Sequence, residues 1–474
     1  MKKLKIIFSI CLVITMGSCK KLIDIPETDL IAGAIALKTV TNCEQGVIGA
    51  YAANDVNMSI LLNSVFADEV KVAEFYNAAT VHEWQFGATD VSIRDSYTAT
   101  NPNYTIIDRL NKVLVALPVA DSTKFGDNTL RNRVKGEALF LRAYAHFELF
   151  RFYCANYTPD GLAMTYMTTP SITGQARIKM APYFTQLNLD LAEAKNLVPN
   201  NLTDINRATR AAVSALQARV ALYQRNWVAA ETFATEYITA LPLSPIGSFA
   251  GIWTDVNTNE VAFRIVKNTG NRMGSLFRGT SASASNIGTV TWGPSGKLWD
   301  SYDKVNDVRF NAYFKNEPLL AALSRPSQLI KKYDGTAYGT TNENVADAKV
   351  FRTGEMILIR AEARAEQAKF AGANSAETDI NSLRTARITG YINQTFASAA
   401  AAINAIMDER FKELPFEGHR FWDLKRSNLP VSRNLADAPS ANSQVLPAGN
   451  FRFLLPLPLR EIQANPLWVQ NPGF

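Results

Sequence analysis

The chain has 474 residues, of which 47% are hydrophobic and 19% charged, so it can bury a large core, and this argues against wholesale disorder. The length allows two or three ordinary domains or one extended helical array. The formal charge of +6 falls to +3 once Lys2, Lys3 and Lys5, which lie in a predicted export signal, are removed. Because no long run of Lys or Arg occurs, no nucleic-acid partner is predicted.

The first residues predict an export signal that ends at a lipid attachment site. A short basic start, MKKLK, precedes an apolar run over 6–16 that is too short to span a bilayer. Small residues stand directly before Cys19, which resembles a bacterial lipobox, so we expect a signal peptide over 1–18 and acylation of Cys19. A lipidated tether over 19–40 would follow. The alternative is an ordinary signal peptide with a Cys there by chance.

Few residues are available for disulfides or metal sites. Besides Cys19, the cysteines outside the signal are Cys43 and Cys154, and their spacing does not tell whether they meet. The histidines are His82, His146 and His419, and neither HxxxH nor CxxC spacing occurs. Zinc motifs depend on such spacings, so we predict no metal site and no cofactor.

Helical periodicity dominates the chain from residue 41 to residue 241. Apolar residues recur at helical spacing over 41–53, 104–117, 131–154, 183–198 and 206–241. Thr41 and Glu44 fit a capping box at the first of these helices, and Asn226 marks a turn within the last. A spacing that resembles a tetratricopeptide unit is shared by Ala218, Trp227, Ala230 and Pro242. One such helical pair cannot bury its apolar face alone, so several should stack.

The character of the sequence changes between about 245 and 350. Gly, Ser, Thr and Asn are frequent there, and helical periodicity is absent from most of it, with a short strand expected over 260–267. Long irregular segments of this kind often carry binding surfaces. Helices return over 353–370, 375–387 and 399–414.

The predicted fold class is therefore mostly α, in a single domain over 41–474. A tetratricopeptide-like helical-pair scaffold takes up about 41–244 and 350–430. A long irregular, loop-rich insertion takes up about 245–350, and an extended tail takes up about 446–474.

The densest charge lies in Met407–Arg426, where ionisable side chains alternate with large apolar ones. One interpretation is the acid–base pair of a surface glycoside hydrolase, with carboxylates such as Glu413 and Glu417. The other is a structural ion-pair motif, composed of Glu409, Arg410, Glu413, Glu417, Arg420, Asp423 and Arg426. An acid catalyst needs a raised pKa, and guanidinium groups nearby lower it, so we favour the structural motif. Its arginines would neutralise its carboxylates and clasp the last scaffold helix to the tail.

Five segments give the chain a resemblance to a known family. They read GEALFLRAYAHFELFRFY (136–153), NRATRAAVSALQARVALYQRNWVAA (206–230), VFRTGEMILIRAEARAE (350–366), DERFKELPFEGHRFWDLKR (408–426) and LLPLPLREIQANPLWVQNPGF (454–474). In this order, and with the lipobox, they resemble the SusD/RagB lipoproteins, which are outer-membrane nutrient-binding proteins of Bacteroidetes. The pattern in 408–426 together with the terminal QNPGF is the most specific part.

The resemblance implies a function without chemistry. SusD-like proteins capture an oligosaccharide, or in some members a peptide, and deliver it to a SusC-like TonB-dependent transporter over which they sit as a lid. The resemblance also implies a tetratricopeptide-like helical scaffold and an outer-membrane lipoprotein at the cell surface. The hydrolase remains the alternative.

Sugar binding without catalysis needs flat aromatic faces together with hydrogen-bonding side chains. Trp84, Tyr97 and Trp292 lie in irregular, polar segments, the first two within 55–103, and we hypothesise that they form an aromatic platform. The other ligand-binding candidates lie near Trp84 and Tyr97 in sequence and are Asp68, Tyr76 and Arg94. The alternative for each ring is burial in the core.

Overall fold

The fold is that of a computed structural model, which describes residues 36–75, 79–123 and 125–474. The predicted signal peptide, Cys19 and Tyr76 lie outside these residues. The described chain is mostly helical with a few short strands, so the predicted fold class is confirmed. No helix within the described ranges is both long and apolar enough to cross a bilayer.

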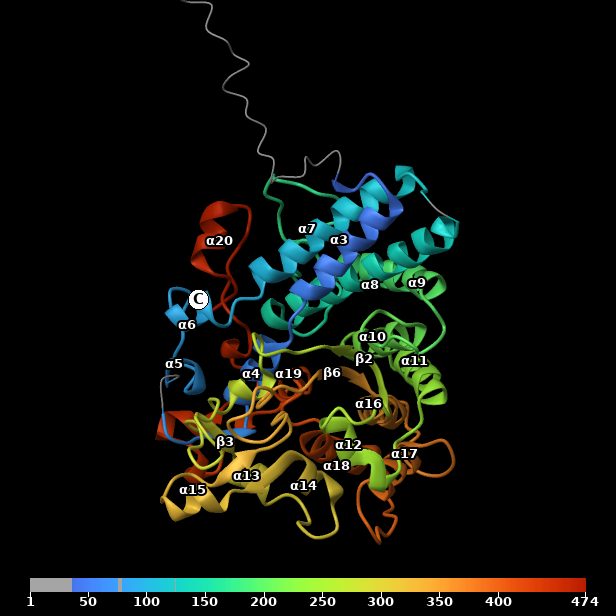
Figure 1. The fold of residues 1–474 in the computed structure, drawn as a ribbon. Coiled ribbons are helices and arrows are strands. Elements are labelled where there is room, and N and C mark those ends of the chain that lie inside the picture. Colours follow the sequence, from blue (N-terminus) through green and yellow to red (C-terminus); the bar gives the residue numbers. More distant parts are fainter. Residues whose placement is uncertain (1–35, 76–78, 124) are drawn as a thin grey trace, which may run out of the picture.

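Helices from the first half of the chain form one end of the molecule (Figure 1). They are α3 (Val40–Ala53), α7 (Thr100–Ala116), α8 (Asp127–Tyr153) and α9 (Met180–Leu197), whereas α4 (Asn57–Phe66) lies near the middle of the molecule and packs on α19 (Arg420–Arg426). Helix α8 packs against α3, α7 and α9, and its residues from 136 to 153 are all buried, as its apolar pattern on several sides predicts. The predicted capping box at Thr41 and Glu44 is wrong. Thr39 caps α3, and its side chain and that of Asn42 each accept a hydrogen bond from the other's backbone N–H.

A chain of packed helices continues through the rest of the scaffold. Helices α10 (Arg210–Tyr223) and α11 (Trp227–Ala240) form an antiparallel pair, and Asn226 caps the second, at the predicted turn. Helix α11 packs on α16 (Thr353–Glu366), which in turn packs on α17 (Ala376–Thr385) and α18 (Ala399–Glu413) (Figure 1). Along the series α9, α10, α11 and α16 each helix thus packs on the next, as in helical-pair scaffolds.

Four two-stranded antiparallel ribbons organise the irregular parts. They are β1 (Val70–Val72) with β3 (Trp292–Pro294), β2 (Val261–Ile265) with β6 (Ala348–Arg352), β4 (Phe314–Asn316) with β5 (Gln328–Ile330), and β7 (Val431–Ser432) with β8 (Val445–Leu446). In the second ribbon Val261 lies opposite Arg352. The segment between β2 and β6 therefore leaves and rejoins the scaffold at one place.

Short helices fill the remaining connections. They are α5 (Ala79–His82), α6 (Val91–Asp95), α12 (Phe249–Trp253), α13 (Gly296–Trp299), α14 (Val308–Tyr313), α15 (Pro318–Ala322), α19 (Arg420–Arg426) and α20 (Leu459–Ala464).

The C-terminal tail folds back against the scaffold. Its Asn471 side chain donates to the backbone carbonyls of Tyr153 and Leu455, both at 2.8 Å, and accepts from Arg177 at 2.9 Å. These contacts fix the tail at the C-terminal end of α8.

Candidate functional site

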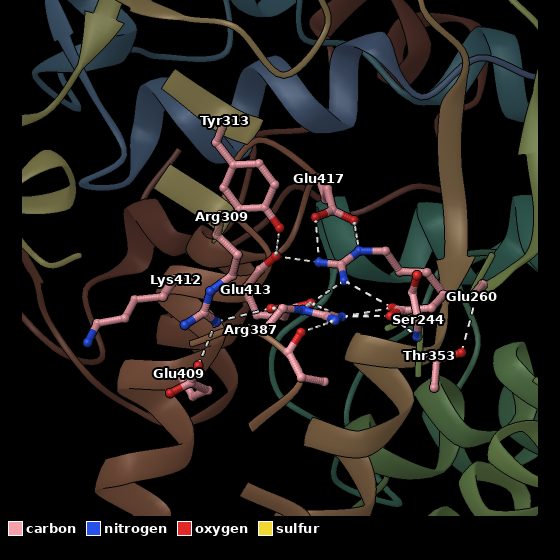
Figure 2. Close-up of polar contacts among 12 residues, drawn as sticks. Ser244, Glu260, Arg309, Tyr313, Thr353, Arg387, Glu409, Lys412, Glu413 and Glu417 are labelled. Atoms are coloured by element: carbon pink, nitrogen blue, oxygen red, sulfur yellow. Dashed lines mark hydrogen bonds and ion pairs between the residues drawn. The ribbon is translucent and has the colours of Figure 1, made fainter. Parts of the chain in front are cut away.

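The charged motif at 408–426 forms the centre of a buried ionic network (Figure 2). The Glu413 carboxylate accepts hydrogen bonds from Arg309 and Arg387, each at 3.0 Å, and from Arg352. All four side chains are almost completely buried. Burial alone would raise the pKa of Glu413, but the three guanidinium groups hold it well below its usual range. Glu413 is therefore a fixed anion.

Most cations in this network come from outside the motif, which differs from our expectation that its own arginines neutralise its glutamates. Glu409 pairs with Arg309 and Arg384, each at 2.6 Å. Glu417 pairs at 2.6 Å with Lys332 and at 2.6 Å with Arg352. Arg309 and Lys332 lie in the segment between β2 and β6, Arg352 lies at its end, and Arg384 lies in the last turn of α17 (Ala376–Thr385).

The remaining residues of the motif form further ion pairs. Asp423 pairs with Arg410 at 2.7 Å and with Arg426 at 2.8 Å, which is the pairing within the motif that we expected. Arg420 instead reaches Asp68, at 2.8 Å, beyond the end of α4. The motif thus joins α18 and α19 to the insertion and to the N-terminal helices, and these ion pairs do not join it to the tail.

This network does not have the form of a glycosidase site. A general acid needs a raised pKa and an open face for substrate. Glu413 is buried with its pKa lowered, and both oxygens of Glu417 accept from cations. The arrangement favours a structural role.

The three rings of the hypothesised platform lie near one another but in the core. Trp84, Tyr97 and Trp292 are 2%, 5% and 4% exposed. The indole N–H of Trp84 donates to the carbonyl of Phe66 at 2.9 Å, and Tyr97 packs on the Phe66 ring. Trp292 lies in β3 with its ring centroid 5.1 Å from that of His82. None presents an open face in this structure, so the platform stays a prediction that requires these rings to become exposed.

The polar candidates are dispersed. Asp68 is 1% exposed, and besides Arg420 it contacts Lys297 at 2.6 Å. Burial alone would raise the pKa of Asp68, but these two cations lower it strongly, so its carboxylate is engaged inside the protein. Arg94 is exposed on α6.

A cavity of about 280 Å³ opens where the two irregular segments of the chain meet, and we name it the Asn54 cavity. Its apolar wall comes from α4, α7 and the insertion and includes Met58, Leu61, Ile106 and Leu276. Its polar residues include Asn54, Asp55, Asn57, Ser96 and Asn103. An apolar pocket with a few convergent polar groups is the usual form of a small-ligand site.

Asn54 is the unusual residue of this cavity. It ends α3 and is 6% exposed, and its side-chain nitrogen has no hydrogen-bond partner. Leaving a buried donor unpaired costs roughly 1–3 kcal/mol. Such groups are rare in native proteins and call for an explanation, of which a missing ligand is one.

Its neighbours are held in place by hydrogen bonds. Lys267 donates to Asp55 at 2.7 Å and to Asn57 at 2.8 Å, and Asn271 donates to Asp55 at 3.0 Å. Burial alone would raise the pKa of Asp55, but Lys267 and these hydrogen bonds lower it, so the carboxylate stays charged. The polar edge of the cavity is therefore pre-organised.

Sequence reasoning did not find these residues. The available signal was the sequence Ala53-Asn54-Asp55-Val56-Asn57, which puts three polar residues between two apolar helices. Such a cluster is typical of any turn, so it does not by itself predict a site.

No group of three or more His, Cys, Asp or Glu residues positioned to hold a metal occurs in the described part of the chain. Cys43 and Cys154 are both buried and free.

Comparisons with known proteins identify relatives of this chain. A family model described as "SusD family" matches residues 290–474, and a second, described as "Starch-binding associating with outer membrane", matches residues 31–222. The SusD-like protein P2 of Formosa agariphila is 23% identical, over 100% of both chains.

Solved structures show the same fold. A SusD superfamily protein from Bacteroides thetaiotaomicron has a TM-score of 0.78 and 21% identity, and the match covers 92% of this chain and 100% of that one. A laminarin binding SusD-like protein has a TM-score of 0.71 and 20% identity, with coverage of 92% and 100%. At these identities the likeness establishes the fold alone.

Proposed function

Because this chain belongs to the SusD family, we propose that it binds oligosaccharides without converting them and delivers them to a SusC-like TonB-dependent transporter. The description of the N-terminal family model, which names starch binding and the outer membrane, supports this proposal. So does the similarity in fold to a laminarin binding SusD-like protein. In this proposal, acylated Cys19 anchors the protein in the outer membrane, at the cell surface.

The Asn54 cavity is the proposed binding site. The observation that carries this assignment is the buried, unpaired side-chain nitrogen of Asn54 beside Asp55, Asn57 and Asn103. The Asn54 amide would donate to a sugar hydroxyl once its side chain turns toward the ligand, and the C–H face of the ring would pack on Met58. None of Asp68, Trp84, Arg94, Tyr97 and Trp292 lines this cavity, and Leu276 is its one lining residue, among those described, from the insertion over about 245–350, so the cavity is a different site from the predicted aromatic platform.

The burial and ionisation of Glu413 favour a binding protein over the alternative hydrolase. Glu413 has no open face, and its lowered pKa keeps it from donating a proton near neutral pH. Release of reducing ends from maltohexaose or laminarihexaose by the purified protein would contradict this part of the proposal.

Binding is tested by calorimetric titration of the full chain with maltohexaose and laminarihexaose. We expect Asn54→Leu to weaken binding at least tenfold, because it removes the amide while keeping a similar volume. Its melting temperature should not fall, since the change also removes a buried unpaired donor. The control is Asn311→Leu, at an exposed asparagine outside the described cavities. Unchanged affinity in Asn54→Leu would remove the cavity from the proposal.

A further inference from the structure

A second opening lies on a neighbouring face of α7. It is a cleft of about 270 Å³ between α7, the loop over 165–175 and the C-terminal tail, and we name it the Trp468 cleft. Tyr104, Ile107 and Asn111 of α7 line it at helical spacing, whereas Asn103 and Ile106 of the same helix line the Asn54 cavity. The two openings are therefore separate sites on one helix.

Two aromatic rings line the Trp468 cleft: Tyr104 is half-buried and Trp468 is 8% exposed. The ring centroids of Tyr104 and Trp468 are 5.8 Å apart, with the planes inclined by 42°. The Trp468 indole N–H donates to the Thr165 hydroxyl at 3.1 Å, and the Tyr104 hydroxyl donates to the Thr165 carbonyl at 2.9 Å. Both rings are thereby fixed before any ligand arrives, which lowers the entropic cost of binding.

The walls are fixed by hydrogen bonds as well. The Asn465 side chain donates to the carbonyl of Gln175 at 2.9 Å, and Arg177 donates to the carbonyl of Val469 at 3.0 Å. On the α7 side, Asn111 donates to the carbonyl of Met167 at 3.0 Å. These contacts hold the loop and the tail at a set distance from α7.

The rim of the cleft is polar but almost uncharged. Hydroxyl and amide side chains surround the rings and include Thr169, Ser171, Thr173, Gln175 and Asn465. Among the described residues that line it, the only charged one is Asp108, which contacts Lys112 at 2.6 Å, and no Lys, Arg or His is present. An anionic ligand would find no cation here to offset its desolvation.

We infer that the Trp468 cleft is a second saccharide site and that it takes neutral sugars. The rings offer an apolar surface to one face of a pyranose, and the hydroxyl and amide groups reach its edge. The volume is just below the roughly 300–1,000 Å³ of pockets for drug-sized ligands, which fits one or two sugar units. This inference rests on the proposed function and extends it to the class of glycan.

The test compares two variants in calorimetric titrations of the full chain with maltohexaose and laminarihexaose. Ser171→Arg places a long side chain at the exposed rim of the cleft without altering the core. We expect two binding sites in the unaltered protein, loss of one site in Ser171→Arg, and loss of the other in Asn54→Leu. The matched control is Thr239→Arg, an exposed position on α11 outside all described cavities, which should keep both sites.

The outcomes separate the two proposals. One site that disappears in Asn54→Leu and is unchanged in Ser171→Arg overturns the second site and leaves the proposed function standing. No binding of either hexasaccharide by the unaltered protein overturns both. Tri-galacturonate is the acidic probe, and its binding in the cleft, lost in Ser171→Ala and kept in Thr239→Arg, would overturn the assignment to neutral sugars.

Discussion

Glu69 is a buried carboxyl group held by neutral donors. The Ser64 hydroxyl and the backbone N–H of Phe416 donate to it at 2.9 Å and 3.1 Å. Burial raises its pKa from 4.5 to about 7, although these hydrogen bonds oppose the shift. Asp68, one residue earlier, has its pKa lowered by Arg420 and Lys297 against the effect of burial. The pKa values of these two adjacent carboxyl groups are thus shifted in opposite directions.

This difference predicts a pH dependence of stability. Between pH 4.5 and 7 the folded protein keeps the Glu69 proton, whereas the unfolded chain loses it. The stabilisation of the folded state by this group is therefore complete below pH 4.5 and is lost as the pH rises through 7. We expect Glu69→Gln to gain roughly 3 kcal/mol of unfolding free energy relative to the unaltered protein between pH 4.5 and pH 8. Urea unfolding at several pH values measures this. Parallel stability curves for the two proteins would show that Glu69 is not the source.

At the residue scale the sequence predicts residue types better than their partners. The seven charged residues of the predicted motif all form ion pairs, but two of the cations that hold Glu413, Arg309 and Arg387, lie 104 and 26 residues away from it along the chain. Pairing over such distances depends on the tertiary fold. The Asn54 cavity could not be predicted for the same reason, because its wall includes Leu276, which is distant along the chain from the other lining residues.

At the scale of secondary-structure elements, the close contact of two helices depends on a single small residue. A Cβ added to Gly136 of α8 would lie 2.8 Å from the Leu197 Cβ and 3.1 Å from the Val198 backbone nitrogen, at the end of α9. The absence of a side chain at Gly136 therefore allows the approach of these two helices.

We expect Gly136→Ala to destabilise the protein by about 1–3 kcal/mol, because backbone atoms would have to move. Gly49→Ala is the matched control, since a Cβ at this position of α3 meets nothing within 4 Å. That change should stabilise the protein by roughly 0.5–1 kcal/mol through helix propensity. Urea unfolding at one pH compares the two, and a shift in the same direction for both would contradict the packing argument.

Long elements with clear periodicity were predictable, and short ones were not. Helices α7, α8, α9, α10, α11, α16, α17 and α18 lie within a few residues of their predicted ranges. Helix α4 was missed inside 55–103 because seven of its residues, from Ser59 to Phe66, are buried, so its sequence has little polar alternation. The expected extended tail includes the short helix α20.

The ionic network unites the molecule as a whole. Glu413 of α18 contacts Arg309 from α14 of the insertion, Arg352 from the end of β6, and Arg387 after α17 (Figure 2). Arg387 also contacts both oxygens of Glu260 at 2.9 Å. Scaffold and insertion are therefore joined through one buried anion.

Removing that charge should affect the whole fold. We expect Glu413→Gln to lower the unfolding free energy by roughly 3–5 kcal/mol, because buried guanidinium groups lose their counter-charge. The control Asp160→Asn removes an exposed partner of Lys179 and should cost at most about 1 kcal/mol. Calorimetry should record one cooperative transition at a lower temperature. An unchanged melting temperature would contradict the joining role of Glu413.

The position of Asn471 has a consequence for the order in which the protein can be completed. Its side chain satisfies the carbonyl of Tyr153, at the end of the longest helix, and that of Leu455. During synthesis, Tyr153 is added to the chain 318 residues before Asn471. Until residue 471 has been synthesised, the carbonyl of Tyr153 at the end of α8 lacks this donor. A chain that ends before Asn471 therefore lacks the hydrogen bonds that hold the tail against α8.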